Sequence, residues 1–215
     1  MAKQEASNRC KVPVSLLIIE GETEQIFYPI IVRKYLSGLR ITRYNLKGQS
    51  NTNKQVIGRT QLFLRDNPND LVRVYCCVDA ERGKRSATPL DLDIVREHIK
   101  ARRLKGVLSV DQLLADPDIE SWFFYDIEGI YSFLRAKRTQ RNPRKYQNPR
   151  SFGKKDLQKL FRQFDKEYLP GKRTVNFISS LNIDKIVSNC KDLHEGIKNI
   201  KRQGRDLTNH LFPGN

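Results

Sequence analysis

Five acidic residues of this chain have the type and spacing for metal or acid–base chemistry. Glu20 follows a run of four apolar residues, and Glu24 comes four positions later. Asp79 and Glu81 follow a second apolar run, and Glu120 lies in a segment rich in apolar and aromatic residues. Carboxylate oxygens are the ligands that hard divalent cations prefer, and carboxyl groups also serve as general acids and bases. These residues are therefore the candidate site.

The elements expected to position the first four acids are two buried strands of a parallel sheet. Leu16–Ile19 and Leu71–Val78 are short apolar runs, a pattern typical of strands covered on both faces. Thr23–Leu36 has apolar residues at helical spacing, so a strand, a glycine turn and a helix put Glu20 at the carboxyl end of the sheet. Open α/β folds bind their ligands there. In the alternative interpretation, these acids only stabilise a helix start or form a solvated turn.

Glu120 belongs to a predicted helix at 115–125 that begins at Asp116 and Pro117. Its neighbours include Ile119, Trp122 and Phe123. A buried carboxylate is costly unless it is paired or metal-bound, which makes Glu120 a functional candidate. The alternative is a residue on the outer face of the helix.

The remaining pattern predicts an α/β fold with a mainly parallel, Rossmann-type sheet flanked by helices and a helical C-terminal extension. Further strands are expected at 41–46 and 107–110, and helices at 54–65, 90–104, 156–168, 179–189 and 193–202. Three parts follow: residues 1–128 as the core that carries the acids, 129–155 as a basic loop, and 156–215 as the extension.

Net charge points to a polyanionic partner. The 215 residues include 40 Lys and Arg against 24 Asp and Glu, a formal charge of +16, and the pI is near 9.9. Nucleic acid is the first expectation and a ribosome or anionic membrane face the second, while a basic surface that serves only solubility is the alternative.

Much of this charge lies between Gly129 and Lys155, a span without any acidic residue. Tyr146 and Phe152 are interleaved with its basic side chains, which predicts an irregular loop suited to a phosphate backbone and one stacked base. A disordered linker is the competing interpretation. The candidate nucleic-acid-binding residues are Arg138, Arg141, Arg144, Lys145, Arg150, Lys154, Lys155 and, further on, Lys172.

Several function classes are disfavoured. No run approaches the roughly 20 apolar residues that span a bilayer, and the N-terminus lacks a signal-peptide core, so a cytoplasmic protein is expected. Isolated histidines and the absence of a CxxC pair argue against zinc, and Cys76 and Cys77 are expected in the core. The chain has no GxxxxGK[ST] loop, so any ATP-driven control would come from a partner chain.

Strand–Glu-Gly–helix followed by strand–Asp-x-acid resembles the TOPRIM domain of topoisomerases, primases and a group of nucleases, over roughly 12–110. In that family a glutamate lies on a strand-to-helix turn and a later DxD motif holds magnesium; here Glu81 replaces the second aspartate. EGETE at 20–24, VDAE at 78–81, IESWFFYD at 119–126 and the segment 172–190 are similar to small bacterial RloB-related proteins and the nuclease half of OLD-type defence proteins.

The resemblance implies a metal-dependent nuclease that hydrolyses phosphodiester bonds in DNA or RNA, tRNA included, as the toxic effector of an antiphage defence system. One or two Mg²⁺ or Mn²⁺ ions would be held by Glu20, Asp79 and Glu81, although the likeness to topoisomerases and primases also allows Glu20 to be the general acid or base instead. Glu24 and Glu120 would complete a second metal position or orient water. An ABC- or SMC-like ATPase partner is expected, and the sequence leaves undecided whether the chain forms a homodimer.

The rival from another class is a non-catalytic nucleic-acid-binding or regulatory subunit of an ATPase-containing complex.

Overall fold

A four-stranded parallel sheet is the centre of the fold in the computed structural model, which describes residues 12–48, 51–80, 89–171 and 174–205. The strands are β1 (Val14–Ile19), β2 (Arg40–Asn45), β3 (Val72–Asp79) and β4 (Val107–Ala115), in the order β2-β1-β3-β4. Every neighbouring pair is parallel. The predicted α/β class, with its mainly parallel sheet and C-terminal helices, is confirmed.

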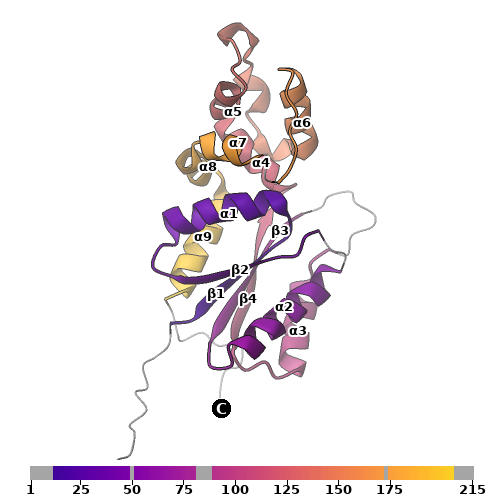
Figure 1. Cartoon of the computed structure of the whole chain (residues 1–215), viewed down its shortest axis with the longest axis vertical. Helices are drawn as coiled ribbons and strands as arrows, with labels where there is room; N and C mark the ends of the chain where they lie inside the picture. Colours follow the sequence, from indigo (N-terminus) through magenta and orange to yellow (C-terminus); the bar gives the residue numbers. More distant parts are fainter. Residues whose placement is uncertain (1–11, 49–50, 81–88, 172–173, 206–215) are drawn as a thin grey trace, which may run out of the picture.

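Helices cover both faces of this sheet (Figure 1). On one face, α1 (Glu22–Tyr35) and α9 (Lys191–Gln203) pack with β1 residues Leu17 and Ile19. On the other, α2 (Thr52–Asp66) and α3 (Leu92–Ala101) pack with Leu16 and Ile18. Successive strand residues point to opposite faces, so the unbroken apolar run of β1 serves both cores at once.

A group of short helices lies beyond the carboxyl ends of the strands (Figure 1), and we call it the helical cap. Its members are α4 (Ile119–Phe123), η1 (Phe124–Asp126), α5 (Ile127–Phe133), η2 (Arg138–Gln140), η3 (Pro143–Tyr146), η4 (Pro149–Ser151), α6 (Lys154–Arg162), α7 (Val175–Ser180) and α8 (Ile183–Asn189). The core under α1 continues into the cap through Trp122, Phe123 and Phe177. The cap is therefore packed onto the sheet at the edge where Glu20 and Asp79 lie.

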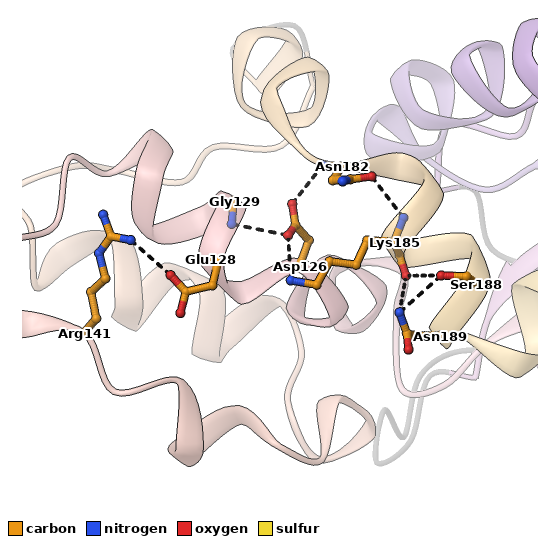
Figure 2. A network of polar contacts seen from close by, with 8 residues as sticks. All are labelled: Asp126, Glu128, Gly129, Arg141, Asn182, Lys185, Ser188 and Asn189. Atoms are coloured by element: carbon orange, nitrogen blue, oxygen red, sulfur yellow. Dashed lines mark hydrogen bonds and ion pairs between the residues drawn. The ribbon is translucent and has the colours of Figure 1, made fainter. Parts of the chain in front are cut away.

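The buried residue Asp126 joins the central and C-terminal helices of the cap through a network of polar contacts (Figure 2). Its carboxylate accepts hydrogen bonds from the backbone N–H of Asn182 at 2.8 Å and of Gly129 at 3.4 Å, and it pairs with Lys185 Nζ at 3.2 Å. Because Asn182 precedes α8 and Gly129 belongs to α5, one side chain holds the C-terminal helices against the central ones.

Two predicted boundaries are wrong around residue 115. The strand expected at 107–110 continues to Ala115, because an edge strand tolerates the polar residues Asp111 and Gln112 that interrupt the apolar run. The next helix begins at Ile119, capped by Asp118 rather than by Asp116. On α3, Val95 and Ile99 are buried and Ile94 is 41% exposed, so Val95 and Ile99 form the inner face.

The segment 129–155 is a series of short helices instead of an irregular loop. Tyr146 is buried and stacks on Phe124 with ring centroids 5.2 Å apart, and Phe152 packs against both rings. Tyr146 therefore does not supply the ring expected to stack on a base, because it completes the core of the cap. Cys76 and Cys77 are buried, as predicted.

Among the described residues, the structure contains no helix of sufficient length and apolar character to cross a membrane.

Candidate active site

The ends of β1 and β3 bring Glu20 and Asp79 together. The parallel register pairs Ile19 with Cys77, so the residues that follow emerge side by side at the carboxyl edge. Glu20 Oε2 accepts a hydrogen bond from the backbone N–H of Asp79 at 3.1 Å. Asp79 Oδ1 in turn accepts from the N–H of Ile119 at 3.0 Å, at the start of α4. These contacts connect both strand ends to the helix that carries Glu120.

Glu24 and Glu120 are buried carboxylates in the first turns of α1 and α4. Their exposed fractions are 5% and 3%, so the outward-facing interpretation of Glu120 is wrong. Glu120 Oε1 accepts hydrogen bonds from Thr23 Oγ1 at 3.2 Å and from Tyr168 Oη at 2.9 Å. Each helix start thus delivers one carboxyl group to the space beside Glu20 and Asp79.

Four of the five predicted acids, Glu20, Glu24, Asp79 and Glu120, line one cavity of about 520 Å³. The helical cap contributes Lys154 and Lys155 at the start of α6, two of the predicted nucleic-acid-binding residues. The remaining acidic lining residues are Glu22, Asp118 and Asp156. Carboxylates thus outnumber lysines in the described lining, although the chain as a whole is strongly basic.

Burial and mutual repulsion raise the pKa values of these acids. Glu24 loses hydration on burial and faces Glu120 and Glu20, which raises its pKa from 4.5 to about 7. Burial, followed by the charges of Glu24, Glu120 and Glu20, raises the pKa of Asp79 from 3.8 to about 9. The pKa of Glu120 is raised by burial and by Asp118. Adding positive charge to the cavity would relieve this repulsion.

Asp118 is a member of the site that sequence reasoning missed. Its Oδ1 caps α4 by accepting from the N–H of Ser121 at 3.1 Å, and its Oδ2 accepts from the N–H of Lys154 at 2.9 Å. A Cβ atom at Gly153 would lie 2.6 Å from Oδ2, so only glycine allows this close approach. The available sequence signal was the residue type, since aspartate is favoured at the N-cap of a helix. Asp118 therefore joins α4 to α6 across the cavity.

The other predicted residues lie elsewhere. Arg138, Arg144 and Lys145 are on the exposed surface of the cap. Arg141 pairs with Glu128 at 3.0 Å (Figure 2), and Arg150 pairs with Asp192 at 2.7 Å. Glu81 and Lys172 lie outside the described residues.

The donor set of the cavity consists of carboxylate oxygens, which suits a hard divalent cation. As placed, the described residues include no group of three or more His, Cys, Asp or Glu side chains that could hold a metal ion, and of the three predicted ligands only Glu20 and Asp79 are described. The raised pKa values of Glu24 and Asp79 reflect repulsion between carboxylates, and a bound cation would reduce this repulsion.

A family model for DUF4276, a domain of unknown function, matches residues 19–198. The chain belongs to the DUF4276 family. The match begins one residue before Glu20 and ends within α9, so this DUF4276 chain carries all four central acids, the cap and Tyr168 inside the family region. No curated protein and no solved structure matches the chain significantly.

Proposed function

We propose that this DUF4276 protein is a metal-dependent nuclease of the TOPRIM kind, hydrolysing phosphodiester bonds in DNA or RNA. One observation carries the proposal: Glu20, Glu24, Asp79 and Glu120 come from four separate elements into one cavity of a chain with a net charge of +16. Carboxylates repel phosphate, so a nucleic-acid-binding chain gains nothing from this cluster unless a cation lies between them.

Glu20 and Asp79 are the residues proposed to hold Mg²⁺ or Mn²⁺, together with Glu81. A bound divalent ion neutralises charge on the phosphate and makes water a better nucleophile. A carboxylate oxygen of Glu24, whose pKa is about 7 in the metal-free protein, can accept a proton from water and return it to the leaving oxygen. Glu120 is proposed to complete a second metal position, and the Nζ atoms of Lys154 and Lys155 attract the phosphate groups beside the scissile bond.

The exposed basic side chains of the cap, outside the cavity, are a second candidate phosphate-binding surface. Arg138, Arg144 and Lys145 are exposed, so their charged ends face solvent. Contacts from such side chains to phosphates contribute affinity without reading sequence. We propose that a strand bound in the cavity continues over this surface. The resemblance to defence proteins supports a toxic antiphage effector in the cytoplasm, controlled by an ATPase partner.

The test is a nuclease assay on plasmid, single-stranded DNA and total RNA, with Mg²⁺, Mn²⁺ or EDTA. Glu20→Gln and Asp79→Asn keep the side-chain volume and remove one charge each, and each should lower the cleavage rate at least about 100-fold. Glu97→Gln, an exposed acid on α3, is the matched control and should cut like the wild type.

Binding without cutting by the purified wild type, with all three substrates and both metals, contradicts the proposal. So does cleavage that survives both substitutions or EDTA. The regulatory-subunit alternative predicts the first of these results, with nucleic-acid affinity unchanged in Glu20→Gln.

A further inference from the structure

The side chain of Tyr168 reaches the acid cluster from the segment between α6 and α7. Its ring is 2% exposed and packs edge-on against Phe161 and Phe177, with centroids 5.4 and 5.9 Å away. Both neighbours are buried in the cap core. The ring is therefore held on two sides, and its hydroxyl has a fixed position 2.9 Å from Glu120 Oε1.

Thr23 donates to the same oxygen from the first turn of α1. Two hydroxyl donors on one oxygen restrict both the rotamer and the plane of the Glu120 carboxylate. This restriction matters because Glu24 and Asp79 repel Glu120, and an unrestrained side chain would turn away from them. Thr23 and Tyr168 are 145 residues apart in the chain, so only the tertiary fold brings their two hydroxyls to Glu120.

We propose that Tyr168 is a positioning residue for divalent-cation binding, acting through Glu120 to keep that carboxylate in the cluster with Glu24 and Asp79. The inference rests on the proposed function and adds to it a residue outside the acid motifs. Hydrogen-bond partners of metal-binding carboxylates change metal affinity by about 10- to 100-fold when they are removed.

Tyr168→Phe tests this directly, because the ring and its packing stay and only the hydroxyl is lost. Mn²⁺ binding is measured by calorimetry or electron paramagnetic resonance without nucleic acid, so the readout does not depend on cleavage. We expect about 10-fold weaker Mn²⁺ binding than in the wild type. Thr23→Val, which removes the second donor, should weaken binding too, and the double variant should differ from the sum of the single effects because both hydroxyls act on one oxygen.

Tyr131→Phe is the matched control. Tyr131 is also 2% exposed, and its hydroxyl accepts a hydrogen bond from the N–H of Asn142 at 3.0 Å, away from the cavity. Both tyrosine variants should lose some thermal stability, while only Tyr168→Phe should lose Mn²⁺ affinity.

Equal Mn²⁺ affinity in folded Tyr168→Phe and wild type overturns the inference while leaving the proposed nuclease intact. Loss of affinity in Tyr131→Phe to the same extent overturns it as well, since the effect would then be structural. If the wild type itself does not bind Mn²⁺, this result contradicts the proposed metal-dependent function and, with it, the role proposed for Tyr168.

Discussion

Removing the charge of Glu24 should stabilise the metal-free protein, and only above a defined pH. The folded-state pKa of about 7 exceeds the ordinary value of 4.5, so the native state binds this proton more tightly than the unfolded chain does. The contribution of Glu24 to stability is therefore complete below about pH 4.5 and is lost as pH rises to about 7. The amide of Glu24→Gln does not titrate, so this variant does not lose stability at this position as pH rises.

The magnitude follows from the shift. A rise from 4.5 to about 7 corresponds to about 3 kcal/mol of unfavourable ionisation at pH 8, as an upper limit. Glutamine keeps the volume but leaves a polar amide in a buried position, so a net gain of about 2 kcal/mol is expected. For a chain of this length, that gain raises Tm by about 4 to 8 °C.

The assay is thermal unfolding followed by circular dichroism, in EDTA, at pH 5 and pH 8. The Tm difference between Glu24→Gln and the wild type should be near zero at pH 5 and reach its full value at pH 8. Glu97→Gln, exposed on α3, should match the wild type at both pH values. A gain that is equal at the two pH values, or a loss at pH 8, would refute the claim that Glu24 is ionised against its neighbours.

Three further outcomes are expected. At pH 8, Mn²⁺ at about 100 times its Kd should stabilise the wild type by about 2.7 kcal/mol, and Asp79→Asn, measured in the same melts, should lose most of this gain. Asp126→Ala leaves the N–H of Asn182 without its partner and should lower the free energy of unfolding by about 2 to 4 kcal/mol. Glu128→Ala, which breaks an exposed ion pair, should lower it by under about 1 kcal/mol. Equal losses in chemical unfolding would contradict the role given to the Asp126 network. Lys145→Glu on the cap surface should raise KM for a long substrate with kcat unchanged and reduce the salt dependence of binding, and a fall in kcat alone would argue against a phosphate contact there.

The sequence alone determined the sheet and the edge at which the first acids lie. The apolar runs of β1 and β3 are typical of strands buried on both faces, and parallel strands bring their carboxyl ends to one edge, so Glu20 and Asp79 were predictable as neighbours. Glu24 followed from helical spacing, about one turn after Glu20 and in the first turn of α1. These are local patterns, and local patterns are readable because strand and helix periods differ.

The tertiary structure decided which side chains complete the cluster. Whether Glu120 faced inward depended on the packing of the cap, and its partner Tyr168 lies 48 residues further along the chain. The sequence also left the position of Tyr146 undecided, because an aromatic ring among basic residues can face a ligand or lie in the core. In the structure it is buried and stacks on Phe124. Contacts between distant segments are set by how whole surfaces fit together, and no spacing within one segment encodes that fit.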